Sequence, residues 1–312
     1  MQAKLSVGLI VGEMRLRAEQ NLARLLAQDS LETLEILVVD VGQEGGGLAG
    51  ADHPSVRYTH RPDLAYYCDA QGELVRQASA PLLAFVEDHS FATPGWARAV
   101  LAAFDDPQVA AVNYAFTNVD DARYLSRSVL MAEYGYWMYP HPGGPVGFSS
   151  STNIAYRLAS LRPLLQGHES AFEAEFLIHR TLLEQGRLIW LAPDAIVAHE
   201  SWRSLADACA ANGANKRVLG ARRASDGGWG RARRFAWAGG MIVAPALFLV
   251  RLARALRHRP SLWGRYLTGL PVCVAIYSYS AWCEALGYLF GAGSSRDEFL
   301  VRELSMRRDG LR

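Results

Sequence analysis

The sequence predicts an α/β domain with an open, mixed but mostly parallel sheet flanked by helices, followed by a C-terminal hairpin of apolar helices. Short β-branched apolar runs alternate with helical segments through the first 200 residues. Two long apolar segments follow, and basic residues are concentrated around them. With 312 residues, 50% hydrophobic and 20% charged, the chain is long and apolar enough to bury such a core.

The N-terminal half of the sequence predicts a βαβ opening that continues into an open sheet. Apolar runs typical of buried strands lie at residues 5–11, 34–40, 56–60, 82–88 and 108–114. Helical patterns between them lie at 18–28, 66–79 and 94–104. This alternation is typical of α/β sheets that bind ligands at the carboxyl ends of their strands.

Regular patterning weakens between residues 117 and 148, where the sequence is rich in aromatic residues, glycine and proline. Such a long loop usually shapes or covers a binding site. Regular structure resumes with a helix over 170–185, which Gly186 ends, and two strands over 187–192 and 195–200.

The C-terminal third is basic and apolar. Between Arg203 and Arg265 there are 13 Lys and Arg residues against 2 acidic ones. Residues 235–250 carry no charge, and residues 266–293 carry only Glu284. Because no nucleic-acid-binding motif accompanies the basic residues, we expect an acidic membrane surface rather than nucleic acid as the partner.

Three domains are expected: a globular domain over 1–203, a basic juxtamembrane helix and hinge over 204–230, and a membrane-associated helical tail over 231–312. The tail could form a transmembrane hairpin or a monotopic, re-entrant or interfacial pair. A helical pair that oligomerises a soluble protein is the third possibility. The N-terminus lacks the pattern of a secretion signal, so we expect the globular domain at the cytoplasmic face of the membrane.

Polar residues follow two of the predicted strands. Asp40 ends the second strand, and Glu87, Asp88 and His89 end the fourth. Ligands bind at this edge of open α/β sheets, so these side chains are candidates for a binding site. Carboxylates and an imidazole together suit Mn²⁺ better than Mg²⁺.

Four segments in this order resemble family 2 glycosyltransferases with the GT-A (Rossmann-like) fold. They read LEILVVDVG, LLAFVEDHSFATPGW, SSTNIAYR and FEAEFLIHRTLLEQGRLIWLAPDAIVAHE, and the resemblance covers residues 5–203. Some members of that family carry a membrane tail, which AWCEALGYLFG resembles. The resemblance implies inverting transfer of a sugar from a nucleotide-diphosphate sugar.

Donor-binding roles follow from the same resemblance. Asp40 would accept a hydrogen bond from the nucleotide base, although Val41 and Gln43 depart from the family pattern beside it. The triplet Glu87, Asp88 and His89 would bind the donor diphosphate. The implied metal ligands, with Mn²⁺ favoured over Mg²⁺, are His89, Asp88, Glu87 and His199.

The catalytic base is expected to be Glu173 or Glu175. In the family register Glu173 matches the usual Glu, whereas Ala174 stands where the catalytic Asp would be. A base must come within ~3 Å of the acceptor hydroxyl. Glu173 is preferred because, on a continuous helix, it would share a face with Leu177 and Arg180.

Asn153 and Trp202 are expected on the acceptor side. The Gln-x-x-Arg-Trp motif of processive synthases is absent, and HESWRS stands in its region, so transfer of a single sugar is favoured. The expected acceptor is a lipid-linked or cell-envelope glycan. Two other interpretations stay open: a catalytically silent GT-A module that binds a nucleotide sugar or partner at the membrane, and a basic membrane scaffold.

Overall fold

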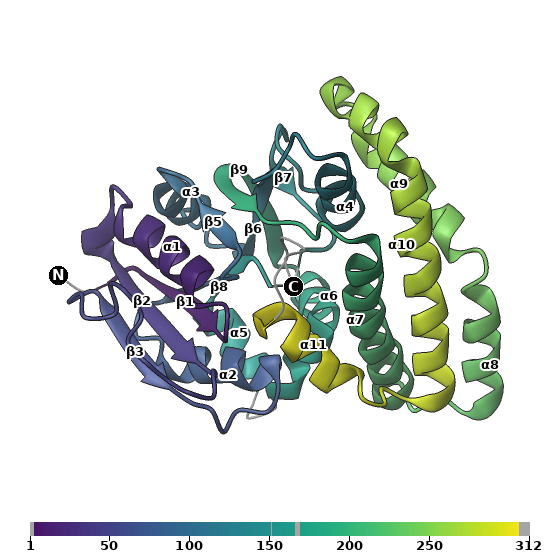
Figure 1. Cartoon of the computed structure of the whole chain (residues 1–312), viewed down its shortest axis with the longest axis horizontal. Helices are drawn as coiled ribbons and strands as arrows, with labels where there is room; N and C mark the ends of the chain where they lie inside the picture. Colours follow the sequence, from purple (N-terminus) through teal and green to yellow (C-terminus); the bar gives the residue numbers. More distant parts are fainter. Residues whose placement is uncertain (1–2, 151, 166–168, 306–312) are drawn as a thin grey trace. The chain divides into compact units, whose positions relative to one another are not determined.

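The computed structural model describes residues 3–150, 152–165 and 169–305, and the chain divides into two compact units (Figure 1). The first unit holds Met1–Thr117 and Tyr139–His199. The second holds Asn118–Met138 and Glu200–Arg312. Two segments that are separate in the sequence therefore build each unit.

Within the described residues, the first unit is built on a nine-stranded mixed sheet. The strand order is β3-β2-β1-β4-β8-β6-β9-β5, and β7 pairs with β9. The strands are β1 (Leu5–Val11), β2 (Leu34–Asp40), β3 (Val56–His60), β4 (Leu82–Val86), β5 (Ser90–Ala92), β6 (Val109–Asn118), β7 (Gly144–Pro145), β8 (Ile154–Arg157) and β9 (Leu188–His199).

One half of this sheet is parallel. Strand β1 pairs in parallel with β2 and β4, and β2 pairs in parallel with β3. Every residue of β1 is buried, which explains its continuous apolar sequence. The pairs β4–β8, β6–β8, β5–β9 and β7–β9 are antiparallel. The mixed α/β sheet is thus confirmed, but the expectation that it is mostly parallel is correct only for β3-β2-β1-β4.

Helices pack against this sheet, as Figure 1 shows for α1 and α2 beside β1 and β2. The helical segments of the unit are α1 (Arg15–Leu26), α2 (Tyr67–Gln77), α3 (Trp96–Ala103), α5 (Leu158–Leu165), α6 (Glu175–Glu184), and the 3₁₀ turns η1 (Leu31–Thr33) and η2 (Glu169–Ala174). Gly8 of β1 allows α2 to approach closely, because a Cβ there would lie 2.7 Å from the Leu74 side chain.

Three sequence-based expectations differ from the observed elements. The helix expected over 170–185 is a 3₁₀ turn, η2, followed by a separate α-helix, α6. The strands expected over 187–192 and 195–200 form one continuous strand, β9. The loop expected over 117–148 contains helix α4 (Tyr124–Tyr134), which belongs to the second unit.

The second unit is helical. With α4 it comprises α7 (Leu205–Asp226), α8 (Arg231–Gly240), α9 (Ala244–Leu256), η3 (Pro260–Leu262), α10 (Trp263–Phe290) and α11 (Ser295–Ser305). Helix α10 packs against α4, α7, α8 and α9. Tyr277 of α10 donates a hydrogen bond to the Ala132 carbonyl of α4 (2.8 Å), which fixes the segment 118–138 in this unit.

The C-terminal apolar hairpin is not supported as expected. Its first segment is broken into α8 and α9, and its second segment, α10, is one helix that packs along the unit and buries Glu284. Across residues 3–150, 152–165 and 169–305, no single helix meets the length and hydropathy needed to span a membrane. The pair α8 and α9 meets them jointly, with a bend of 57° between the two helices.

Candidate functional site

The polar residues predicted at two strand ends lie at one edge of the parallel half of the sheet. Asp40 is the last residue of β2 and pairs with Val11 of β1, while Glu87 follows β4 on the other side of β1. Parallel strands place their carboxyl ends at the same edge. The strand order, with β1 between β2 and β4, therefore brings both groups to that edge.

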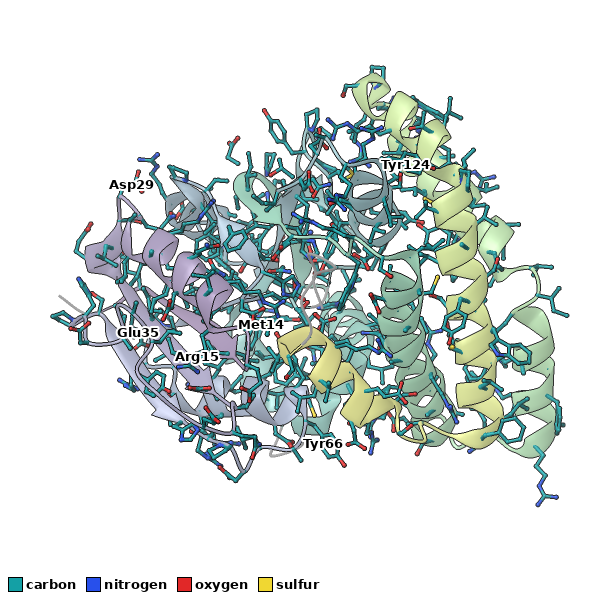
Figure 2. All side chains as sticks on the ribbon, in the orientation of Figure 1. Met14, Arg15, Asp29, Glu35, Tyr66 and Tyr124 are labelled. Carbon is teal, nitrogen blue, oxygen red and sulfur yellow. The ribbon has the colours of Figure 1, made fainter. Side chains whose placement is uncertain are left out.

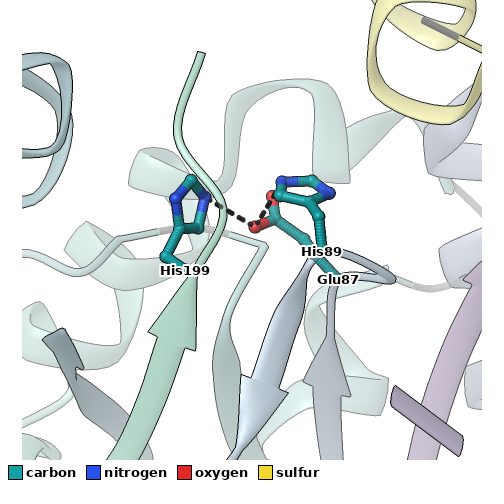
Figure 3. A group of neighbouring side chains, drawn as sticks. All are labelled: Glu87, His89 and His199. Carbon is teal, nitrogen blue, oxygen red and sulfur yellow. Dashed lines mark ion pairs between the residues drawn. The ribbon is translucent and has the colours of Figure 1, made fainter. Parts of the chain in front are cut away.

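Glu87, His89 and His199 form a buried cluster at this edge (Figure 3). The Nε2 atom of His89 lies 3.3 Å from Glu87 Oε2, and the Nε2 atom of His199 lies 3.6 Å from the same oxygen. His199 reaches the cluster because β9 pairs antiparallel with β5, which sets His199 opposite Ser90. A side chain more than one hundred residues away in the sequence thus joins the strand-end triplet.

Several donors hold the Glu87 carboxylate. Thr152 Oγ1 and Asn153 Nδ2 donate to its oxygens, and Ser90 Oγ donates to Oε2 (3.1 Å). The Glu87 backbone N–H donates to Asn153 Oδ1 (3.2 Å). Burial by itself would raise the pKa of Glu87, but the adjacent His89 and His199 outweigh it and hold that pKa well below its ordinary value. Glu87 is therefore an ionised, oriented ligand at neutral pH.

Asp88 does not face the cluster that Glu87 and the two histidines form. Arg17 Nε donates to Asp88 Oδ2 (2.8 Å), and His89 Nδ1 lies 2.8 Å from Asp88 Oδ1. A carboxylate on Nδ1 holds the imidazole proton there, so that Nε2 carries the lone pair that could bind a metal. Asp88, expected to bind a metal directly, thus contacts Arg17 and His89 in this structure, and its role as a ligand stays a prediction.

The cluster fits a divalent cation. One ligand atom from each of Glu87, His89 and His199 lies within 4.8 Å of the others. A carboxylate with two imidazoles is a donor set that suits Mn²⁺, whereas Mg²⁺ prefers oxygen ligands. All three side chains are buried and are therefore shielded from bulk solvent.

Asp40 is fully buried and already engaged. Arg15 Nη1 and the Tyr58 hydroxyl donate to its Oδ2, and the Gly42 backbone N–H donates to Oδ1 (2.9 Å). Arg15 and Tyr58 both donate to the Gly46 carbonyl as well. The second strand end is therefore a hydrogen-bonded group of Asp40, Arg15 and Tyr58 rather than a lone carboxylate.

Helix α1 connects the two strand ends, and sequence reasoning missed this. Arg15, labelled in Figure 2 at the start of the helix, binds Asp40, while Arg17 binds Asp88. One turn later, Asn21 Nδ2 donates to the carbonyls of Glu87 (2.7 Å) and Ser90 (3.1 Å). The sequence signal for this connection was the pair Arg15 and Arg17, which follow β1 closely. Positive side chains at that position can reach the acidic residues that end β2 and follow β4.

The two candidate bases lie in different surroundings. Glu173 is half-buried in η2, and the Cys68 thiol lies 4.0 Å from its Oε1. Glu175 begins α6, is 4% exposed, and accepts a hydrogen bond from Gln71 Nε2 (3.2 Å). Because the helix changes from 3₁₀ to α between them, the reason given for preferring Glu173, a shared α-helical face with Leu177, is wrong.

The residues expected on the acceptor side belong to different units. Asn153 is fully buried in the first unit, with its amide group bound to Glu87, so it positions that carboxylate. Trp202 belongs to the second unit and is 1% exposed. The structure thus shows Asn153 bound to Glu87, and the expected contacts of Asn153 and Trp202 with an acceptor stay predictions.

Comparison with protein families gives one match over this part of the chain. Residues 15–165 match the family model of Glycosyl transferase family 2. No curated protein sequence matches the chain. The matched residues include Asp40, the Glu87 to His89 triplet and Asn153.

Among solved structures, the fold is similar to that of the mannosyltransferase PcManGT from Pyrobaculum calidifontis in complex with GDP-Man and Mn²⁺. The identity is 14%, the TM-score is 0.58, and the likeness covers 93% of this chain and 88% of that one. Glucosyl-3-phosphoglycerate synthase from Mycobacterium tuberculosis, in complex with phosphoglyceric acid, is 16% identical with a TM-score of 0.46 over 73% of this chain and 81% of that one. GalNAc-T7 with UDP, GalNAc and Mn²⁺ is 10% identical with a TM-score of 0.47 over 63% and 43%.

Proposed function

We propose that the chain is a glycosyltransferase, because its residues 15–165 match the family model of Glycosyl transferase family 2. It would move a single sugar, with inversion, from a nucleotide-diphosphate sugar to a lipid-linked or cell-envelope glycan acceptor. The observation that carries the proposal is the buried cluster of Glu87, His89 and His199 at the carboxyl edge of the sheet. A site for a cation at that edge is what departure of a nucleoside diphosphate requires.

A divalent cation bound there would neutralise the negative charge that develops on the departing diphosphate. Glu87, His89 and His199 would hold it, and Asp88 would keep His89 in the tautomer that presents Nε2. We favour Mn²⁺ over Mg²⁺ because two of these three ligands are imidazoles. The similarity in fold to a mannosyltransferase in complex with GDP-Man and Mn²⁺ supports this choice.

The base of the donor would bind at the other strand end. Asp40, Arg15 and Tyr58 offer a carboxylate, a guanidinium and a phenol within one hydrogen-bonded group. Both oxygens of Asp40 already accept hydrogen bonds, so a base N–H would share or replace one of the present donors. Arg15 and Tyr58 are then the groups whose rearrangement would accompany donor binding.

Glu173 remains the proposed catalytic base because its side chain is more accessible than that of Glu175. Its side chain is half-buried, whereas Glu175 is almost fully buried and receives a hydrogen bond from Gln71. A base must reach the acceptor hydroxyl and accept its proton, and a side chain with some access can do so. Glu175 then links α6 to α2 through its hydrogen bond with Gln71.

The acceptor and the location are proposed from the sequence after residue 203. The basic and apolar sequence after residue 203 supports an acceptor held at a membrane, met at its cytoplasmic face. An enzyme kept at that surface would meet such an acceptor at a raised effective concentration. Trp202, next to the end of β9 in the sequence, is proposed on the acceptor side.

The donor is tested by thermal unfolding with a panel of nucleoside diphosphates, each with Mn²⁺, with Mg²⁺ and without metal. A ligand of the native state raises the unfolding temperature according to its concentration relative to Kd. We expect one nucleotide to stabilise the chain more than the others, and more with Mn²⁺ than with Mg²⁺. A panel without any metal-enhanced response would contradict the proposed donor site.

Turnover of that donor then tests the base. Glu173→Gln keeps the size of the side chain and removes its basicity, so kcat should fall roughly 10²- to 10⁴-fold while donor binding persists. Glu184→Gln, on the exposed side of α6, is the matched control and should retain full activity. Full activity in Glu173→Gln together with a loss in Glu175→Gln would assign the base to Glu175.

A further inference from the structure

The break between α8 and α9 carries exposed apolar side chains. Ile242 and Val243, within the break, are 84% and 57% exposed. Further exposed apolar residues lie on both sides of it: Phe235 and Trp237 on α8, and Leu247 and Val250 on α9. Among the described residues, no residue of α8 is buried. Water-exposed apolar side chains gathered in one short segment indicate an interaction surface.

Basic residues flank this apolar segment at both ends. Exposed arginines precede it at Arg231 and Arg233 and follow it at Arg251, Arg254 and Arg257. The sequence contains no Asp or Glu between Gly227 and Cys283. The segment therefore presents an apolar centre between two positive ends, and no acidic residue lies in this stretch of the sequence.

The outward face of α9 changes character along its length. Leu247, Val250 and Arg254 lie three or four residues apart and so share one face of the helix, while Leu252 and Leu256 are buried on the other. That outward face is apolar near the break and basic toward the end of α9. A helix with this gradient can bury its first turns while its last turns stay at a charged surface.

The uncharged segment is too short to span the hydrocarbon core of a membrane. The 16 uncharged residues from 235 to 250 would extend about 24 Å even as one straight helix, against a hydrocarbon core of about 30 Å. The 57° bend shortens that reach further. An apolar segment of this length with basic ends is typical of a helix that lies at the boundary between headgroups and acyl chains.

We propose that the bent pair of α8 and α9 is a docking surface for an anionic lipid bilayer. Ile242 and Val243 insert at the boundary of headgroups and acyl chains, and the flanking arginines, Arg231, Arg233, Arg251, Arg254 and Arg257, contact lipid phosphates. The choice of a bilayer over an acidic protein rests on the combination of an apolar apex with positive charge on both sides of it. This inference rests on the proposed function only in that a membrane-held acceptor gives the docking a purpose.

The test uses the intact chain and two kinds of vesicle, phosphatidylcholine alone and phosphatidylcholine mixed with phosphatidylglycerol. We expect co-sedimentation with the anionic vesicles, weaker binding to the neutral ones, and a decline in binding as salt rises. Val243→Glu should lower the affinity for anionic vesicles by about tenfold or more. The matched control is Val301→Glu on α11, because Val301 is also exposed, at 52%, and lies outside the surface.

The arginines are tested separately. Arg251→Ala combined with Arg254→Ala should weaken binding to anionic vesicles roughly thirtyfold and binding to neutral vesicles little. Arg98→Ala, which removes an exposed arginine of α3, is the control for loss of charge alone. Equal losses in the double variant and in the control would overturn the proposed role of the arginines.

Two further results would overturn the docking surface itself. One is the absence of binding to either vesicle. The other is self-association without lipid that Val243→Glu abolishes, because the surface would then join two copies of the chain. Nucleotide- and Mn²⁺-dependent stabilisation is measured on the same variants. If it persists while vesicle binding fails, the docking surface is wrong and the proposed donor site stands.

Discussion

Asp88 lies between the Arg17 guanidinium and the His89 imidazole, and both contacts bear on its role. Its Oδ2 accepts from Arg17 and its Oδ1 lies against His89 Nδ1. In the proposed metal site, Glu87 and His89 would present ligand atoms and Asp88 would orient His89. Such supporting groups commonly change metal affinity 10- to 100-fold when they are replaced.

Asp88→Asn should therefore weaken Mn²⁺ binding by about 10- to 100-fold without unfolding the chain. The amide keeps the size of the side chain but loses the charge that holds the proton on His89 Nδ1. Titration calorimetry with Mn²⁺ measures the change. Asp105→Asn, at an exposed acid before β6, is the control. Unchanged Mn²⁺ affinity in Asp88→Asn would show that Asp88 does not orient a ligand.

His179 of α6 is buried, and its Nε2 lies 2.7 Å from the Tyr156 hydroxyl. Burial lowers the pKa of His179 from 6.5 to about 3. A histidine with a depressed pKa contributes stability above its unfolded pKa, and that contribution is lost as the pH falls below about 6.5. Protonation would place an uncompensated charge in the core.

Lowering the pH from 7.5 to 5.5 should reduce the unfolding free energy by roughly 1.4 kcal/mol because of His179. His179→Asn cannot titrate, so its stability should change less over that interval than the stability of the wild type. Urea unfolding at the two pH values measures the difference. His258→Asn, at an exposed histidine, shows whether loss of any imidazole gives the same result. Parallel pH profiles for wild type and His179→Asn would contradict a depressed pKa.

At the scale of elements, glycines set the close packing of α7 against α10. A Cβ on Gly287 of α10 would lie 2.2 Å from the Arg217 carbonyl of α7, and a Cβ on Gly220 of α7 would lie 2.4 Å from the Glu284 carbonyl. Backbone atoms cannot move aside as a flexible side chain can. The two helices can therefore approach this closely only because no side chain separates them at these positions.

Gly287→Ala should destabilise the chain by about 1–3 kcal/mol, because the added methyl group forces the two helices apart. Gly264→Ala on the same helix is the matched control, since within the described part of the chain a Cβ there meets nothing within 4 Å. That control should be neutral or slightly stabilising, as alanine favours helix over glycine. Chemical denaturation measures both. An equal effect of the two substitutions would argue against close packing at Gly287.

Element boundaries were predictable where local sequence decides them. Strands β1, β2 and β3 begin and end where the apolar runs predict. The change from η2 to α6 was missed, because both segments have helical sequence and only packing separates them. Helix α4 was also missed, because its partners on α7 and α10 lie far along the chain and the aromatic residues around it suggested a loop.

At the scale of the whole molecule, the cluster joins the turn after β4 to the end of β9. Glu87 and His199 are held together by the pairing of β5 with β9, so a cation bound there would tie distant parts of the first unit. A ligand that binds the folded state and not the unfolded state raises the unfolding free energy of the folded chain.

Mn²⁺ at about one hundred times its Kd should add roughly 2.7 kcal/mol to the unfolding free energy and raise the unfolding temperature by several degrees. His199→Ala should remove most of that increase, although the residue is remote from the triplet in sequence. Differential scanning calorimetry with and without Mn²⁺ measures the rise in unfolding temperature for each variant. His53→Ala is the control, because His53 lies outside the cluster. Equal increases in wild type and His199→Ala would exclude His199 as a ligand.

The sequence by itself determined the α/β class, the order of the first strands and the strand ends where Asp40 and the Glu87 triplet stand. These properties are local, since periodicity and chain polarity lie within a few neighbouring residues. Only the tertiary structure decided that Asp88 turns to Arg17, that Asn153 supports Glu87, and that the apolar tail bends at Ile242. Those outcomes depend on pairings and packing between residues far apart in the chain, and local patterns do not specify which distant group each side chain meets.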